Sequence, residues 1–465
     1  MKKIGKWLDD RGGFSELVKP LKTHLVPPGT GWNYVWGSAT LLCLIVQVLT
    51  GIALAFLYQP TTNAAYQSLQ YIEHQAFLGS FIRGLHSWGA SGMIVLLGVH
   101  MVRVYLFAAY KYPREMNWIS GVLLLAVTIT MAFTGQLLRW DSNGVWTAVV
   151  GAEQMGRIPF IGDSVAHFFL GGTTVSGETL NRYFSMHTLL VPAILFAILG
   201  FHIWLVFRNG ISEPPKAGRK VDPRSYRDWY KKLLKKKGEP FFPNVIWRDA
   251  VTALVILVIL IGFAWLVGAP ELTALPDTSY IKAHPQPDWY FTWIYAMFAL
   301  MPWRIESYMI VLIPLVGGAF LFSIPFLAKG GERSPLRRPW AIGGVIFVLV
   351  SVWSLWYIGN RAPWAPRFDA KRISIYTTVP NPSPGVRHGI ELFNTMGCIY
   401  CHKVGKNGGI RGPELTNVQQ RMTREQMIIR IVNGAENMPA FGGTLSKEEL
   451  DNIVDFLMKE KKPEQ

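Results

Sequence analysis

The chain alternates between long apolar runs and polar connections. Seven runs contain no Asp, Glu, Lys or Arg, and they span residues 34–58, 84–102, 118–138, 183–207, 251–270, 307–328 and 340–360. Each run has about 19 to 25 residues, enough for a helix to cross roughly 30 Å of hydrocarbon. The pattern predicts an all-α, polytopic membrane protein with seven transmembrane helices, which we call spans A to G in chain order.

Spans B and D each contain two histidines at a matched spacing. His86 and His100 are 14 residues apart in span B, and His187 and His202 are 15 apart in span D. At a rise of 1.5 Å per residue, both spacings place the imidazoles on nearly one helix face, about 21 to 23 Å apart. Two such helices side by side would form two histidine pairs, the geometry for two b-type haems stacked across a bilayer. A histidine in a membrane helix can also serve packing alone, but four matched ionisable residues favour function.

Glycines repeat with the same period in the neighbouring spans. Gly37 and Gly51 are 14 apart in span A, and Gly121 and Gly135 are 14 apart in span C. Glycine is common where membrane helices pack closely, so the repeat alone is ambiguous. Together with the histidines it indicates a four-helix cage in which the backbone approaches each haem edge.

Two arginines flank the histidines of span B. Arg83 lies three residues before His86, and Arg103 lies three residues after His100. A guanidinium at either position could neutralise a haem propionate. The alternative is an ordinary arginine that extends its charged end to the membrane interface.

Composition and charge agree with a membrane protein. Hydrophobic residues make up 50% of the chain and charged residues 16%, and the net charge is +16. Twelve Lys and Arg residues lie between 208 and 248, whereas the long connections 139–182 and 271–306 hold five together. Anionic lipid therefore explains the basic charge better than nucleic acid, and the positive-inside rule predicts a cytoplasmic N-terminus and an outer location for everything after span G. No cleavable signal peptide is recognisable at the N-terminus.

The C-terminal part has the composition of a small soluble domain. The chain has three cysteines, and two of them form the motif Cys398-Ile399-Tyr400-Cys401-His402, which is the signature of covalent c-type haem attachment. His402 would be the proximal ligand. Met438, in Asn437-Met438-Pro439, is the candidate sixth ligand, with a plain core or loop methionine as the alternative.

These patterns divide the chain into five parts. The predicted parts are a di-haem four-helix bundle at 1–210, a basic inner-surface linker at 211–248, a three-helix module at 249–362, a Pro-rich linker at 363–384 and a cytochrome c domain at 385–465.

The membrane part closely resembles the cytochrome b subunit of the cytochrome bc family, the quinol:cytochrome c and quinol:plastocyanin oxidoreductases. The resemblance covers residues 1 to about 360 and, beyond the histidine spacings, lies in the segments 83–88 (Arg-Gly-Leu-His-Ser-Trp), 111–118, 133–135 (Phe-Thr-Gly) and 287–290 (Pro-Asp-Trp-Tyr). The 15-residue spacing in span D looks like the short type of the family, in which the four-helix and three-helix parts are separate chains. Here they are fused, and the C-terminal domain independently resembles class I cytochrome c.

The resemblance implies a Q cycle in a bacterial cell membrane. Quinol would be oxidised at an outer site near His86 and His187, with one electron going to a separate Rieske iron–sulfur protein and on to the c haem. The other electron would cross the two b haems to an inner quinone site. Asp288, where the family usually has glutamate, is the candidate proton acceptor, with Tyr290 beside it in the same site; without the family, Asp288 reads equally well as a helix N-cap.

The chain departs from the family at the outer site and at span A. At the end of span C, Gln136 stands where the family has tyrosine and Arg139 where it has proline, so the quinol pocket must differ in shape and charge. Short-type relatives attach an extra haem through a cysteine at the position of Val35. Because Cys43 lies deeper in the span, we expect no covalent haem there, although a further non-covalent haem at the inner quinone site stays open.

The expected partners are the Rieske protein, quinol and quinone, the lipid bilayer and either further cytochrome c subunits or a soluble electron acceptor. The family also implies a homodimeric complex. One alternative is a di-haem membrane anchor that passes electrons between quinone and a partner dehydrogenase or reductase. A haem-free transporter or scaffold with a tethered sensor domain is a second alternative.

Overall fold

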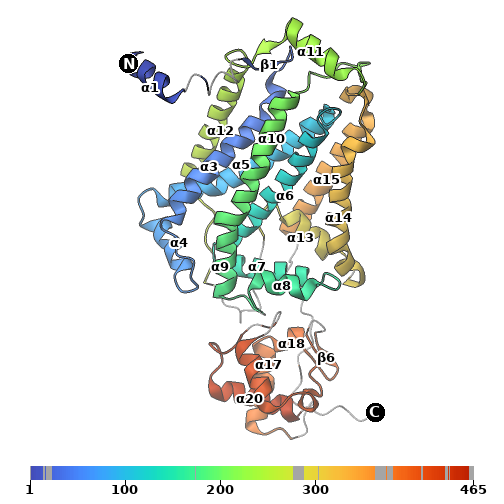
Figure 1. The fold of residues 1–465 in the computed structure, drawn as a ribbon. Helices are drawn as coiled ribbons and strands as arrows, with labels where there is room; N and C mark the ends of the chain where they lie inside the picture. The colour runs from blue at the N-terminus through green and yellow to red at the C-terminus, as the bar shows by residue number, and fades with distance from the viewer. Residues whose placement is uncertain are drawn as a thin grey trace. The chain divides into compact units, whose positions relative to one another are not determined.

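A computed structural model of the chain is shown in Figure 1. It describes residues 2–13, 16, 23–172, 174–275, 287–301, 303–361, 373, 381–409, 412–434, 438 and 440–459. The predicted Pro-rich linker at 363–384 therefore lies mostly outside the described residues.

Within the described residues, seven helices are long and apolar enough to cross a membrane. They are α3 (Trp36–Ala55), α5 (Gly79–Leu106), α6 (Glu115–Leu137), the continuous helix Gly177–Asn209, α12 (Ile246–Leu266), Tyr308–Leu327 within α14 (Trp303–Leu327), and α15 (Pro339–Arg361). They correspond in order to spans A to G, so the predicted all-α, seven-span membrane fold is confirmed. The helix Gly177–Asn209 consists of α9 (Gly177–Ser185), the π-helical segment η2 (Met186–Leu190) and α10 (Val191–Asn209).

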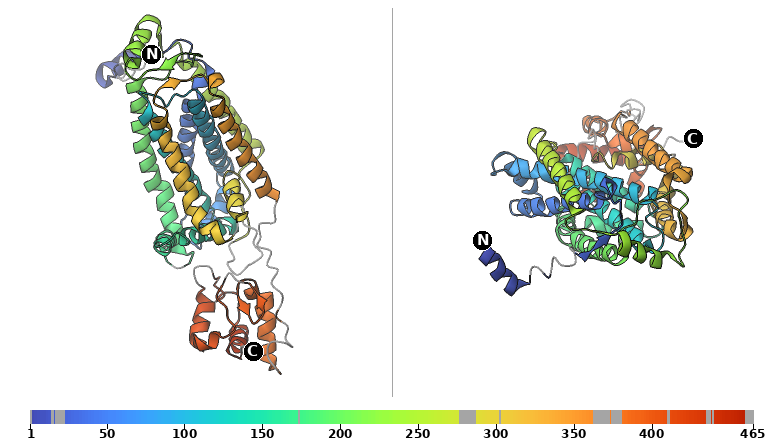
Figure 2. Two further views of the ribbon diagram at one scale, coloured as in Figure 1. Left: turned by 90° about the vertical axis from the view of Figure 1, so that its right-hand side faces the viewer. Right: turned by 90° about the horizontal axis from the view of Figure 1, so that it is seen from above.

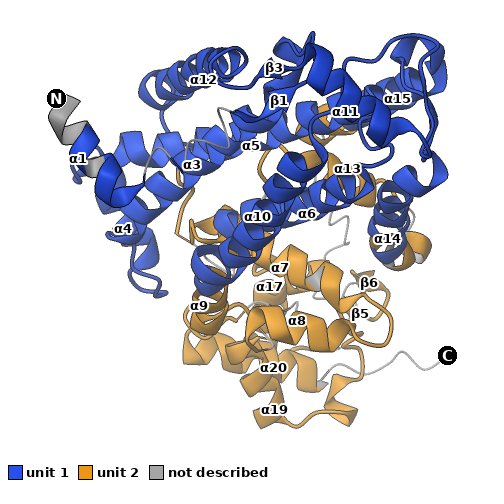
Figure 3. Cartoon of the chain, turned by 45° about the horizontal axis from the view of Figure 1, so that its top comes forward, with its two compact units in different colours: residues 1–136, 184–271, 311–354 blue, residues 137–183, 272–310, 355–465 orange. Residues whose placement is uncertain are grey.

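The chain forms two compact units, which Figure 3 colours separately. Unit 1 contains residues 1–136, 184–271 and 311–354, and unit 2 contains residues 137–183, 272–310 and 355–465. The four histidines of spans B and D belong to unit 1. The Asp288 segment and the cytochrome c domain belong to unit 2.

Within unit 1, α3, α5, α6 and α10 run alongside one another (Figures 1 and 2). Cys43, Met93, Leu195 and Leu260 form one buried cluster that joins α3, α5, α10 and α12. The helices approach closely where they carry small residues: a Cβ on Gly84 would lie 3.2 Å from the carbonyl oxygen of Ala264. This packing suits a lipid environment, where close backbone contact replaces the hydrophobic effect as the force between helices.

A buried polar cluster fixes the end of the bundle where α10 finishes. Arg114, just before α6, donates from Nε to the carbonyl of Gly210, 2.7 Å away, and from Nη1 to the hydroxyl of Tyr226. The Tyr226 hydroxyl donates to Glu213, which also forms a buried ion pair with Arg333. Because these groups satisfy one another, the starts and ends of several spans are held in register.

Short elements complete unit 1. They are α1 (Lys2–Gly12), η1 (Trp32–Tyr34), α4 (Ala65–His74), α11 (Tyr226–Lys237), η3 (Pro335–Arg337), the antiparallel pair β1 (Leu25–Val26) with β3 (Glu239–Pro240), and the pair β2 (Lys220–Val221) with β4 (Gly331–Glu332).

Unit 2 contains the long C–D connection, part of the E–F connection and the C-terminal domain. Its elements outside the spans are α7 (Ser142–Gly156), α8 (Gly162–Leu170), α13 (Thr292–Ala299), α17 (Pro384–Thr395), α18 (Cys398–Cys401), the pair β5 (Lys403–Val404) with β6 (Asn407–Gly408), η4 (Val418–Gln420), α19 (Arg424–Asn433) and α20 (Lys447–Lys459).

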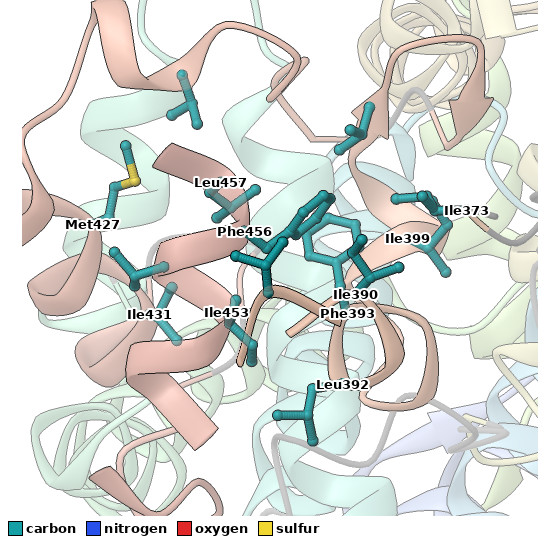
Figure 4. Packing of buried hydrophobic residues seen from close by; sticks show 14 of the residues in the cluster. Ile373, Ile390, Leu392, Phe393, Ile399, Met427, Ile431, Ile453, Phe456 and Leu457 are labelled. Atoms are coloured by element: carbon teal, nitrogen blue, oxygen red, sulfur yellow. The ribbon is translucent and has the colours of Figure 1, made fainter. Parts of the chain in front are cut away.

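The C-terminal domain has a hydrophobic core of its own, drawn in Figure 4. Phe393 of α17 and Phe456 of α20 meet edge to face, with ring centroids 5.6 Å apart. These two helices cross at Gly389, where a Cβ would lie only 2.0 Å from the carbonyl oxygen of Asn452. Only glycine permits this crossing, so the sequence fixes where the two helices touch.

Candidate functional site

The four histidines of spans B and D fall into two pairs. The ring centroids of His86 and His187 are 6.4 Å apart, and His100 and His202 lie close enough to interact electrostatically. Two metal–imidazole bonds of about 2.0–2.1 Å, together with the radii of both rings, span roughly 6 Å. The first pair is therefore already spaced to hold one metal ion between its rings. No group of three or more His, Cys, Asp or Glu side chains gathers for a metal among the described residues.

Each of these histidines faces one of the four periodic glycines. A Cβ would lie 3.2 Å from the ring of His100 at Gly37, 3.3 Å from His86 at Gly51, 3.7 Å from His202 at Gly121 and 2.6 Å from His187 at Gly135. The glycines therefore leave open the space beside each ring that a flat group would need. This geometry fits a haem.

Three hydroxyl groups contact these imidazoles from the residue next to a periodic glycine, and sequence reasoning missed them. Thr50 Oγ1 lies 2.9 Å from Nδ1 of His86, Thr134 Oγ1 lies 3.1 Å from Nδ1 of His187, and Ser120 Oγ lies 2.8 Å from Nδ1 of His202. The signal was present in the sequence, because each hydroxyl residue directly precedes one of the periodic glycines.

A π-helical turn explains why span D has 15 residues between its histidines and span B has 14. The segment Met186–Leu190 is π-helical, and the amide of Val191 donates to the carbonyl of Met186, five residues earlier. Pro192 follows at the start of α10 and has no amide to continue the regular ladder. A π turn holds one residue more than an α turn. The extra residue is therefore accommodated next to His187, and His202 stays on the same face of the helix as His187.

The two arginines of span B have different surroundings. Arg83 is 9% exposed and forms an ion pair with Glu73 of α4, while its Nη2 donates to the carbonyl of Pro270, 2.8 Å away. Arg103 lies over the ring of Tyr34, 3.8 Å from its centroid. Its Nε and Nη2 are buried without an acceptor among the described residues. Arg103 therefore retains donors for an anionic group, whereas Arg83 already has a carboxylate partner.

The Asp288 segment places a carboxylate and a phenol in direct contact. The hydroxyl of Tyr290 donates to Oδ2 of Asp288 across 2.7 Å. Burial, reinforced by the Asp288 carboxylate, holds the pKa of Tyr290 well above its usual value, so this phenol stays protonated. The N-cap of α13 is Phe291 rather than Asp288, so the N-cap interpretation of Asp288 does not describe this segment.

The unusual Arg139 has a partner that the sequence reasoning did not identify. Its Nη2 donates to the fully buried Asp141, 2.6 Å away. Asp141 also accepts from the amides of Gly144 and Thr273, both at 2.9 Å, and thereby connects the C–D and E–F segments of unit 2. Gln136, three residues before Arg139, is also buried. The added positive charge is thus balanced by a carboxylate within the same unit.

The Cys-x-x-Cys-His motif forms the short helix α18 and the turn after it. His402 is buried, and its Nδ1 lies 2.9 Å from the carbonyl of Pro413, which leaves Nε2 for a metal. A Cβ on Gly412 would lie 2.6 Å from the ring of His402. Burial raises the pKa of Cys398 to about 12 and lowers the pKa of His402, as expected for groups that face an apolar space.

Met438 packs partly buried against the core of the same domain. Asn437 and Pro439 lie outside the described residues. The role of Met438 as the sixth ligand stays a prediction.

Comparisons with protein families match three parts of the chain. The family described as cytochrome b/b6/petB matches residues 21–210, the family described as cytochrome b(C-terminal)/b6/petD matches residues 277–378, and the family described as cytochrome C oxidase, cbb3-type, subunit III matches residues 384–457. The predicted resemblance of the membrane part and the presence of a C-terminal cytochrome c domain are confirmed.

Similar proteins agree with these matches. Cytochrome b6 of Heliobacterium modesticaldum is 40% identical over 210 residues, covering 45% of this chain and 99% of that protein. Cytochrome b6 of Cyanidium caldarium is 38% identical over 214 residues, covering 46% and 100%. A solved structure described as a hyperthermophilic respiratory Complex III has a TM-score of 0.65 at 25% identity and covers 85% of this chain and 96% of its own. Because nearly the whole of each cytochrome b6 relative is matched, the chain belongs to the cytochrome b/b6 family, as a di-haem membrane subunit fused to a cytochrome c domain.

Proposed function

We propose that the chain is the fused cytochrome b and c subunit of a quinol:cytochrome c oxidoreductase that runs a Q cycle and translocates protons. The observation that carries the proposal is the Asp288–Tyr290 hydrogen bond of 2.7 Å in the segment that the family uses for quinol. A simple di-haem membrane anchor needs only the histidine bundle, whereas this chain adds three further spans and the Asp288 segment.

The histidine pairs would hold two non-covalent b-type haems, His86 with His187 and His100 with His202. Cys398 and Cys401 would attach one c-type haem, with His402 and Met438 as its axial ligands. When bound, haem supplies one-electron transfer at each of these positions. The protein supplies the imidazole ligands, and the periodic glycines leave the room beside them. Arg103, and Arg83 if it exchanges partners, would bind propionates.

Asp288 would accept a proton when quinol is oxidised. A carboxylate can take this proton as a general base, provided that it lies within hydrogen-bond reach of the quinol hydroxyl. Tyr290 donates to Asp288 and keeps its own proton, so it orients the carboxylate without competing for the proton. Asp288 has a shorter side chain than glutamate, and the bond from Tyr290 compensates by fixing its direction.

The cycle would need a separate Rieske protein as the acceptor of the first electron from quinol. The c domain would pass that electron to a further cytochrome or a soluble acceptor. The excess of Lys and Arg in the N-terminal, D–E and F–G segments supports a cytoplasmic N-terminus and an outer c domain in a bacterial cell membrane. The five-part division of the chain given above and a homodimeric complex belong to the same proposal.

The test is quinol oxidation by the purified complex with Asp288→Asn. Loss of the general base is expected to lower the rate by about 10²-fold or more while both b haems remain reducible by dithionite. Asp141→Asn is not a suitable control, because Asp141 is buried and accepts hydrogen bonds that connect the C–D and E–F segments. The matched control is Asp163→Asn, at the start of α8. If Asp288→Asn oxidises quinol at the rate of the control, Asp288 is not the proton acceptor and the quinol site proposed around it is wrong.

A further inference from the structure

The hydroxyls of Thr50, Ser120 and Thr134 each have their single hydrogen already in use. Thr50 donates to the carbonyl of Val46 at 2.6 Å, Ser120 to that of Met116 at 2.8 Å, and Thr134 to that of Thr130 at 2.9 Å. In each case the acceptor lies four residues earlier in the same helix, which is a common arrangement for Ser and Thr in helices.

The remaining lone pairs of each hydroxyl oxygen can therefore only accept. The neighbouring imidazole must supply the hydrogen, so Nδ1 of His86, His187 and His202 carries the proton. A neutral imidazole with its proton on Nδ1 presents an unprotonated Nε2, which is the atom that binds a metal. The tautomer of three histidines is thus fixed before any metal arrives.

We propose that Thr50, Thr134 and Ser120 are positioning residues that hold these imidazoles in the metal-binding tautomer and tune the redox potential of the group bound between them. An acceptor on the Nδ1 hydrogen raises the basicity of a metal-bound imidazole. A more basic ligand stabilises the ferric state over the ferrous state. Each hydroxyl is therefore expected to lower the midpoint potential of the haem that its histidine would bind.

The number of hydroxyl contacts differs between the two histidine pairs. Within the described part of the chain, His86 and His187 both contact a hydroxyl, whereas in the other pair only His202 does. The glycine beside His100 is Gly37, which is preceded by Trp36. Among the described residues no hydroxyl bonds to His100. The chain thus provides two potential-lowering contacts at the His86–His187 pair and one at the His100–His202 pair, and this difference favours electron flow from the first pair to the second.

The experiment is a potentiometric titration of both b haems in the purified full-length protein, read by their visible absorption. Thr50→Val and Thr134→Val should each move the midpoint of one haem to higher potential and leave the other unchanged. Ser120→Ala should move only the other haem. The matched control is Thr130→Val on α6, because the Thr130 hydroxyl is exposed and, among the described residues, donates to the carbonyl of Ala126 and contacts no histidine.

Conservative variants separate a positioning role from a loss of folding. Thr50→Ser and Thr134→Ser retain the hydroxyl and should restore the original midpoints. The proposal is overturned if the valine variants titrate like Thr130→Val, or if each of them shifts both haems equally. The proposal rests on the proposed haem sites, which a haem count by pyridine haemochrome tests separately. Fewer than two extractable haems in the unmutated protein would contradict the haem sites themselves and not the effect of the hydroxyls.

Discussion

At the scale of single residues, the four periodic glycines are not equivalent. A Cβ on Gly135 would lie 2.6 Å from Cε1 of His187, a distance that real Cβ atoms do not tolerate, whereas a Cβ on Gly121 would lie 3.7 Å from His202 in ordinary van der Waals contact. Adding a methyl group should therefore cost more free energy at Gly135 than at Gly121, because a closely packed interior cannot accommodate the overlap.

We predict that Gly135→Ala displaces His187 and yields protein with one extractable b haem instead of the two proposed for the unmutated protein. Gly121→Ala serves as the comparison and should retain both haems. The haem content of each purified variant, measured by pyridine haemochrome after acid-acetone extraction, checks the prediction. Equal haem loss in both variants would show that the contact with His187 does not decide binding.

At the scale of elements, sequence periodicity correctly predicted the seven spans because the bilayer allows only one solution for an uncharged run of this length. The predicted topology, in which spans B and D run in the same direction, pairs His86 with His187, as the structure has them. The glycine repeat predicted close backbone approach to a haem edge, and in the structure each of these glycines lies against a histidine ring. Sequence periodicity could not show the π turn at Met186–Leu190, since the bonding of a single turn is decided by Pro192 and by packing. The pairing of Arg139 with Asp141 could not be predicted either, because the periodicity of apolar residues carries no information about side-chain partners two residues apart.

The π turn yields a prediction about span D. Deletion of Leu189 should convert Met186–Leu190 to regular helix, give span D the 14-residue spacing of span B, and retain both b haems. Insertion of one alanine after Leu189 should instead rotate His202 by about 100° and abolish binding at one pair. Haem counts of the two variants provide the measurement. Loss of a haem on deletion would mean that the bulge itself, and not only the spacing, is required.

At the scale of the whole molecule, the membrane bundle and the C-terminal domain have separate hydrophobic cores. The core of the C-terminal domain is drawn from residues between 373 and 457, and the core around the histidines is drawn from α3, α5, α10 and α12. Neither core contains a described residue of the other. Folding of the two parts should therefore be independent, even though the chain joins them, because each part buries its own apolar surface.

This independence predicts the behaviour of a variant with both thiols removed. Cys398→Ser combined with Cys401→Ser removes both thiols proposed to attach the c haem, so the protein should lose covalent haem completely and keep the two proposed b haems, which are extractable. Quinol should still reduce those b haems through the bundle, while electrons should no longer reach an external cytochrome c acceptor. Denaturing gels stained for haem peroxidase activity and reduced-minus-oxidised spectra distinguish the two pools. If the b haems disappear together with the c haem, the two cores depend on each other for folding, and the fusion is a structural requirement rather than a tether that holds the acceptor domain near its electron source.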